Sequence, residues 1–223
     1  MQGQFSFVQN TFNQIEQTIS PERLARYLPD ALGDKQLALR LYLWNARISE
    51  TFYFPIQTAE VAVRNAIKKP LEKKYGNQWY KEGKFTNLLS DYKKNELSKV
   101  IRLETGKRGE AVLTQNHIVA GLSFGFWVGL MASAFKNHIW VNGINQSFPN
   151  AKAEDDQKSI FNKLEKMRCF RNQIMHHYAI FDKKPQTEYQ NILAISKLIC
   201  DDTHWLIKRC SNVGQTLNKR PTA

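Results

Sequence analysis

The chain has 223 residues, 42% apolar and 23% charged, a composition typical of a globular protein that excludes a disordered, collagen-like or fibrous chain. Its 32 Lys and Arg against 20 Asp and Glu give a formal net charge of +12, which favours a polyanionic partner, nucleic acid first and an anionic membrane surface second. Gly (11 residues) and Pro (7 residues) are scarce, which favours helices over short strands.

The first predicted elements are three helices. Apolar residues at helical spacing predict an amphipathic helix over 5–19. The triplet Ser20-Pro21-Glu22 combines an N-cap, a proline at the first helical position and an acid in the first turn, and so predicts a second, short helix. A long helical pattern then follows Asp34; we expect Pro55 to kink or split it and Gly76 to end it.

The basic excess is concentrated in residues 68–108, which hold twelve Lys or Arg and five Asp or Glu, whereas residues 1–67 balance at six and six. A helix over Asp91–Leu103 and a loop over Thr105–Gly109 are predicted here. Basic residues interleaved with Tyr and Trp suit single-stranded RNA. The alternative is a solvated helix whose rings point inward, and we expect an electrostatic role for the lysines and core packing for most rings. The basic residues predicted to bind RNA are Lys68, Lys69, Lys73, Lys74 and, further along the chain, Arg168.

Residues 118–135 form an apolar run without a charge, preceded by Thr114 as a plausible N-cap. The run is at the lower length limit for a membrane span. Its three glycines, spaced four apart, and its two serines favour the alternative, a buried helix or helix pair that a neighbouring helix approaches closely. We therefore expect no membrane partner.

The remaining pattern predicts a short helix around 135–148, a helix from Asp155 or Asp156, and a last helix from Pro185 or Thr187, with fraying after Asn212. No period-2 alternation of useful length is present, so the prediction is a single all-α domain over 1–223. Its parts are N-terminal helices 5–76, a basic stretch 77–113, an apolar segment 114–148, and the motif and C-terminal helices 153–212.

Three cysteines without CxxC spacing argue against a disulfide framework or a structural zinc site. The N-terminus lacks the basic start and compact apolar core of a signal peptide, so we expect a cytoplasmic protein. The histidines show no metal-ligand spacing, and neither a metal nor a cofactor is predicted.

The segment over 167–182, MRCFRNQIMHHYAIFD, is the most informative for chemistry. Arg171, Asn172 and His176 are types that suit metal-independent RNA cleavage. An imidazole can exchange a proton with a ribose oxygen, a guanidinium can clamp the scissile phosphate, and the 2′-hydroxyl is an internal nucleophile. His177 is a supporting candidate. The alternative is that Arg and His cap a helix C-terminus, where the dipole favours positive side chains.

The stretch Arg171 to His176 fits the RNxxxH form of the Rx4–6H motif of the HEPN superfamily, and RNQIMHHYAIF resembles the RNxxxHH segment of Abi-like (abortive-infection) bacterial proteins. Two further segments are similar to the same proteins in the same order, so the resemblance covers roughly residues 20–205. They are SPERLARYLPDALGDKQLALRLYLWNARISE with IQTAEVAVRNAI, and LSFGFWV at 122–128.

The resemblance implies an all-α, HEPN-like helical bundle with additional helices, and a phage-defence or toxin endoribonuclease. It implies a homodimer in which two copies of Arg171 and His176 form one composite site, with Asn172 as the intervening polar residue. An antitoxin and a regulatory non-coding RNA are implied as further partners. Some members of the superfamily only bind, so the alternative is a catalytically inactive module that holds RNA or a toxin partner.

A second constellation lies on the long predicted helix. Glu60 and Arg64 are an i, i+4 pair, and Asn65 follows. We interpret Glu60 as a carboxylate that orients His176 or Arg171, with Arg64 adding to the phosphate site. The alternative is a pair on the helix face that contributes only a few tenths of a kcal/mol.

Overall fold

The computed structural model describes residues 8–141 and 143–222, and in these ranges it contains helices and no strand. The predicted all-α class is confirmed; its likeness to a HEPN bundle stays a prediction. The contacts divide the chain into two compact units, which are described one at a time. The first unit comprises Met1–Pro55, Phe170–Gln190 and Cys210–Ala223, and the second Ile56–Cys169 and Asn191–Arg209. That the chain is one domain also stays a prediction.

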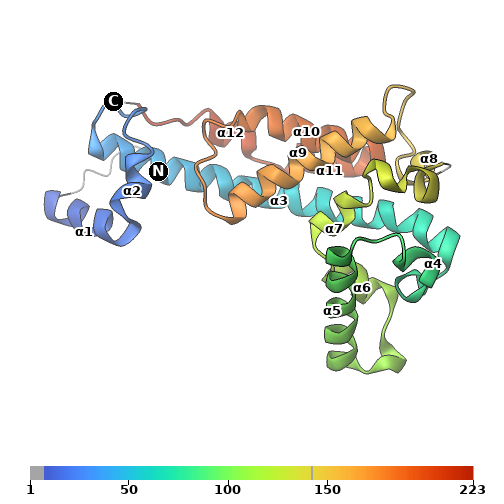
Figure 1. Ribbon diagram of the computed structural model, residues 1–223. Coiled ribbons are helices and arrows are strands. Elements are labelled where there is room, and N and C mark those ends of the chain that lie inside the picture. Colours follow the sequence, from blue (N-terminus) through green and yellow to red (C-terminus); the bar gives the residue numbers. More distant parts are fainter. Residues whose placement is uncertain (1–7, 142, 223) are drawn as a thin grey trace. The chain divides into compact units, whose positions relative to one another are not determined.

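The first unit is built around the N-terminal part of a long helix. Its elements are α1 (Gln9–Ile19), α2 (Pro21–Ala25), the first part of α3 (Lys35–Tyr75), the end of α9 (Gln157–Met175), the start of α10 (Pro185–Ile199) and α12 (Val213–Leu217) (Figure 1). The Ser20 hydroxyl accepts from the Arg23 amide at 3.2 Å, and the Asp34 carboxylate accepts from the Gln36 amide at 2.7 Å. The predicted helix starts at Ser20 and after Asp34 are therefore confirmed. The predicted start of the first helix, at residue 5, lies outside the described residues.

Helix α3 runs without interruption from Lys35 to Tyr75, so the alternative that Pro55 splits it is wrong. A proline inside a helix removes one backbone hydrogen bond and costs about 3 kcal/mol. Phe52 and Ile56, on either side of it, are buried, and burial of large apolar side chains outweighs that cost. The helix ends as predicted at Gly76, whose φ of 76° is the left-handed conformation that glycine adopts freely.

The second unit contains a cluster of buried aromatic rings. Its elements are the rest of α3, η1 (Trp79–Lys81), α4 (Gly83–Thr86), α5 (Asp91–Arg108), η2 (Glu110–Val112), α6 (Gln115–Gly121), α7 (Phe124–Gly129), η3 (Ser133–Phe135), η4 (Lys136–Trp140), α8 (Ile144–Ser147), most of α9, the end of α10 and α11 (Asp201–Cys210). Trp79 contacts Phe85 at 5.5 Å and Trp127 at 5.7 Å between ring centroids. Trp79 and Tyr80 are buried, as expected of most rings near the basic stretch.

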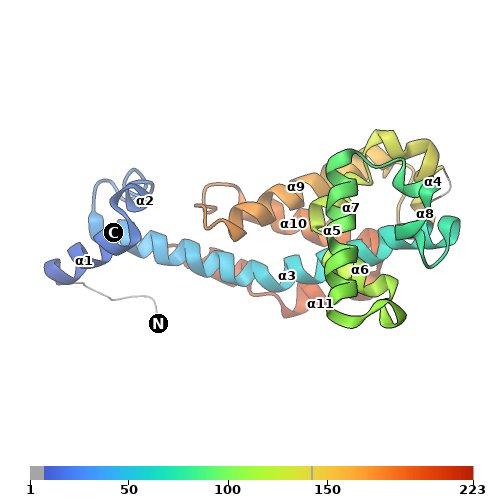
Figure 2. The same cartoon turned by 60° about the horizontal axis from the view of Figure 1, so that its bottom comes forward.

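The apolar segment forms a pair of short helices, α6 and α7, with Thr114 capping the first together with His117. The interpretation as a buried helix pair is thus confirmed. Helices α5 and α6 lie side by side (Figures 1 and 2), and a Cβ on Gly121 would come within 2.7 Å of a Val100 methyl. In the described part of the chain, no helix is long and apolar enough to cross a membrane.

Three boundaries differ from the predictions. The prediction of a loop over Thr105–Gly109 is wrong because α5 continues to Arg108, and Glu104 is bonded to both Lys107 and Arg108. The predicted last helix divides at Cys200 into α10 and α11. Fraying after Asn212 is wrong because α12 is held by a bond from the indole of Trp44 to a carbonyl within it.

Candidate functional site

The position of the Arg171–His176 motif follows from helix α9, which buries one of its faces. The side chains of Ile160, Leu164, Met167 and Phe170 are buried as predicted, and the Asp156 carboxylate caps the start of the helix at the Ser159 amide, 2.7 Å away. The Arg-Asn and His-His pairs consequently occupy the last turn of α9 and the residues just beyond it.

The helix ends in a Schellman turn. The His177 amide donates to the Ile174 carbonyl at 3.0 Å, and the Tyr178 amide donates to the Gln173 carbonyl at 2.9 Å. His177 adopts a φ of 58°, a left-handed conformation that is uncommon for residues other than glycine and in which His is enriched. This turn directs the chain sharply away from α9 immediately after His176.

The two imidazoles are exposed, and Arg171 and Asn172 are half-buried. The Arg171 guanidinium donates to the Asn172 side-chain oxygen at 3.4 Å, so these two groups lie together. The rings of His176 and Tyr178 are 6.2 Å apart between centroids. The exposed imidazole and the half-buried Arg171–Asn172 pair therefore belong to the same helix end.

Asn45 anchors this turn, and the sequence analysis missed it. It is a buried residue on α3 whose side-chain oxygen accepts from the Ile180 amide at 2.7 Å and the Phe181 amide at 3.1 Å, and whose amide donates to the Tyr178 carbonyl at 3.3 Å. The one signal available was an asparagine at an inward-facing position of the helical pattern.

The loop after the turn packs on the N-terminal helices. The ring of Phe181 stacks on Tyr27 at 5.3 Å, and the guanidiniums of Arg26 and Arg220 lie over it at 5.7 and 5.9 Å. Arg26 is also paired with Asp182. Burial raises the pKa of Tyr27 to about 12, with a further contribution from Tyr42.

The constellation at Glu60 lies in the second unit, whereas Arg171, Asn172 and His176 lie in the first. Glu60 is buried and paired with Arg64, as predicted, and Arg64 also donates to the Ala120 carbonyl at 3.1 Å. These bonds belong within the second unit. Asn65 is exposed. The predicted role of Glu60 in orienting the motif stays a prediction.

Several of the basic residues predicted to bind RNA are engaged with other groups. Lys68 pairs with Glu72 at 3.3 Å, Lys74 donates to the His138 carbonyl, and Arg168 pairs with Glu165. The hydrogen bond from Arg168 holds the pKa of Glu165 below its ordinary value. By contrast, Lys69 and Lys73 are exposed. Binding of RNA by this group stays a prediction.

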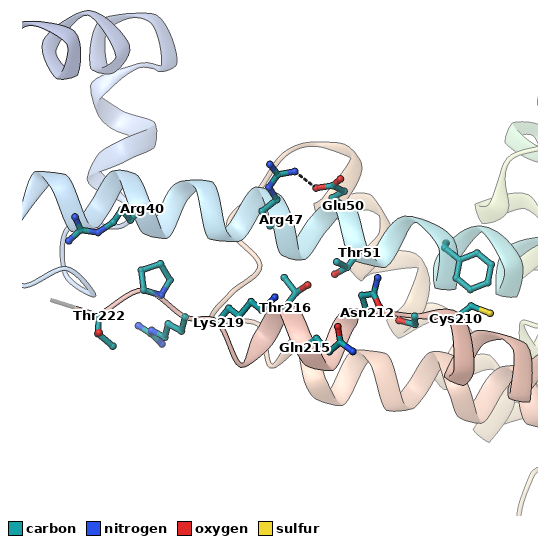
Figure 3. A pocket seen from close by; sticks show the side chains of 14 residues that line it. Arg40, Arg47, Glu50, Thr51, Cys210, Asn212, Gln215, Thr216, Lys219 and Thr222 are labelled. Atoms are coloured by element: carbon teal, nitrogen blue, oxygen red, sulfur yellow. Dashed lines mark hydrogen bonds and ion pairs between the residues drawn. The ribbon is translucent and has the colours of Figure 1, made fainter. Parts of the chain in front are cut away.

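A polar cleft of about 1190 Å³ lies in the first unit, between α3 and the C-terminal segment 210–222. Figure 3 shows Thr51 on the side of α3 that faces Asn212, Thr216 and other polar side chains of that segment, while Arg47 and Glu50 extend from the other side of the helix. Four basic side chains and one carboxylate line the cleft. The sequence analysis did not predict it, because its cations come from opposite ends of the chain.

Within the described ranges, no three His, Cys, Asp or Glu side chains gather as ligands of a metal ion, and Cys169, Cys200 and Cys210 form no disulfide. The Thr114 amide donates to the His117 ring at 3.2 Å, and a ring nitrogen of His204 lies 3.0 Å from the Leu193 carbonyl.

No protein-family model matches the chain, and comparisons with curated proteins and with solved structures give no match either.

Proposed function

We propose that the protein is an endoribonuclease that cleaves RNA without a metal ion, in phage defence or as a toxin. The observation that carries the proposal is the last turn of α9, where an exposed His176 follows a contacting Arg171–Asn172 pair. The resemblance of the RNQIMHHYAIF segment to Abi-like proteins of the HEPN superfamily supports the same chemistry.

In this mechanism the ribose 2′-hydroxyl attacks the adjacent phosphorus and the bond to the 5′-oxygen breaks. An imidazole accepts the proton from the 2′-oxygen, and a protonated imidazole donates one to the leaving 5′-oxygen. Arg171 binds the phosphate and stabilises the charge that develops on it, and Asn172 positions the guanidinium. The products are a 2′,3′-cyclic phosphate and a 5′-hydroxyl end.

The resemblance to HEPN proteins supports a composite site in which the acid and the base come from two copies of the motif. We propose a homodimer in which His176 of each copy takes one of these roles. Light scattering at micromolar concentration should give twice the chain mass; a monomer that still cleaves RNA would contradict the composite site.

The test is cleavage of RNA in EDTA by the full chain. His176→Ala and Arg171→Ala should each lower the rate about a hundredfold or more. The matched controls are His138→Ala and Arg102→Ala, which remove exposed side chains of the same types from the second unit. Equal cleavage by all four variants, or none by the wild type, would overturn the proposal.

The binding alternative makes a different prediction in cells. A module that only holds RNA or a toxin partner should not stop growth when overproduced, whereas the nuclease should, in a manner that depends on His176. Sequencing of RNA ends after brief expression of wild type and of His176→Ala would identify the RNA that is cut.

A further inference from the structure

We infer that the polar cleft between α3 and segment 210–222 binds the backbone of single-stranded RNA. The choice of RNA rests on the proposed function, but the cleft is separate from the motif residues, none of which lines it. The inference begins from charge. Arg40, Arg47, Lys219 and Arg220 line the cleft, and Glu50 is its single acidic residue.

These four cations differ in what engages them. Arg47 pairs with Glu50 at 2.7 Å (Figure 3), and Arg220 pairs with Asp30 at 2.7 Å. The side chains of Arg40 and Lys219 have neither an ion-pair nor a hydrogen-bond partner among the residues that the structure describes. Two cations in a cleft without a carboxylate partner are available to phosphates.

The rest of the lining suits a nucleotide polymer. Asn212 and Gln215 are exposed amides that can bond sugar or base edges, and Phe54 is a half-buried ring on which a base can stack. From Arg40 to Phe54 the helix extends about 21 Å, at 1.5 Å per residue. The volume of about 1190 Å³ exceeds the range of about 300–1,000 Å³ that small-molecule pockets occupy. Length and volume therefore favour several linked nucleotides over a single one.

The cleft is connected to the motif turn through shared neighbours in the first unit. Trp44 contacts Phe181 at 6.2 Å between centroids and donates to the Thr216 carbonyl at 2.9 Å, and the next residue, Asn45, bonds the loop after the motif. Arg220 lies over both Trp44 and Phe181. A strand of RNA in the cleft would consequently rest on the same stretch of α3 that fixes the turn after His176.

The test measures binding of the full chain to a fluorescent oligouridylate of about twelve nucleotides whose 2′-hydroxyls are methylated, so that it cannot be cleaved. Arg40→Ala with Lys219→Ala should weaken binding about tenfold at low salt and reduce the slope of log K against log salt by about 1.4, because each single-strand phosphate contact contributes about 0.7. The charge-conserving pair Arg40→Lys with Lys219→Arg should retain the slope.

The matched control is Lys158→Ala with Lys197→Ala, which removes two charges at exposed positions of the second unit and should leave the slope within about 0.3 of the wild type. If the alanine pair in the cleft fails to fold, Gln215→Glu places a negative charge at an exposed lining position and should also weaken binding several-fold.

Several results would overturn the inference. One such result is a slope of log K against log salt that is the same in the alanine variants of the cleft as in the wild type. Binding of uridine monophosphate as tight as the oligonucleotide would indicate a small-ligand pocket, and equal binding of a polyglutamate of the same length would indicate an acidic peptide site. Failure of the proposed function is distinguishable, because the cleft variants would then lose affinity for an RNA that the wild type does not cut.

Discussion

Both compact units pair some basic side chains with a carboxylate one helical turn away, as Arg47 pairs with Glu50 in the first, but the first unit also gathers cations in a cleft. In the second unit, cations lie one helical turn from a carboxylate: Lys107 and Arg108 both bond Glu104, and Arg168 bonds Glu165. In the first unit, Arg40 and Lys219 line a cleft and have no such partner among the described residues. The richest basic stretch of the sequence is thus partly neutralised by its own helical spacing.

The difference shows that local charge density and available charge are separate properties. Residues 1–67 carry equal numbers of acids and bases, and yet they supply two of the cations in the cleft. Helical pairs form between residues three or four apart and can be read from sequence. A cleft forms between segments brought together by folding, so its charge depends on tertiary contacts.

The largest expected loss of stability comes from removing Asn45, the α3 side chain that holds the turn after His176. Asn45→Ala leaves the buried amides of Ile180 and Phe181 without their acceptor, and should lower the free energy of unfolding by about 3 kcal/mol in urea titration. Asn65→Ala, at an exposed position of the same helix, should change it by less than about 0.5 kcal/mol. Equal effects would show that the turn does not depend on Asn45.

A second test concerns the close packing in the second unit. Gly121→Ala brings a Cβ to within 2.7 Å of Val100 and should destabilise the protein by about 2 kcal/mol in the same titration. Val100→Ala in the same chain should relieve the clash, so that the double variant loses less than the sum of the two single changes. Gly106→Ala, with open space around it inside α5, should instead stabilise by about 0.5 kcal/mol.

The third prediction concerns alkaline pH and the first unit. The pKa of Tyr27 is about 12 in the folded protein against an ordinary 10.0, so its contribution is complete below pH 10 and is lost as the pH rises toward 12. Between pH 9 and pH 11, the wild type should lose about 1.4 kcal/mol of unfolding free energy more than Tyr27→Phe does. Tyr92→Phe, at an exposed ring, should behave as the wild type.

The smallest expected change in stability concerns Arg168 in the second unit, which is paired with Glu165. The hydrogen bond from Arg168 lowers the pKa of Glu165 from its ordinary 4.5, so this stabilisation is present above pH 4.5 and is lost as the pH falls through the lowered value. Arg168→Gln should reduce the unfolding free energy at pH 7 by no more than about 0.5 kcal/mol, because the pair is partly exposed. A gap that stayed constant down to pH 2 would rule out this ionic origin.

Much of the fold could be predicted from local patterns. The starts at Ser20 and Asp34, the end at Gly76 and the buried stripe of α9 follow from capping chemistry and helical spacing, which involve residues within one or two turns of each other. Two of the errors have a common cause. Pro55 inside α3 and the ordered α12 both depend on burial or bonds with distant residues, which outweigh local propensity.

The sequence by itself determined the helical class and the buried stripe of the helix that carries the Arg-Asn pair, because both depend on spacing along the chain. Only the tertiary structure decided that Asn45 holds the turn after His176, that Arg64 also bonds the Ala120 carbonyl, and that Arg40 and Lys219 line one cleft. The physical reason is that a side chain's partners are set by which segments pack together, and hydrophobic burial, which drives that packing, does not depend on separation in sequence.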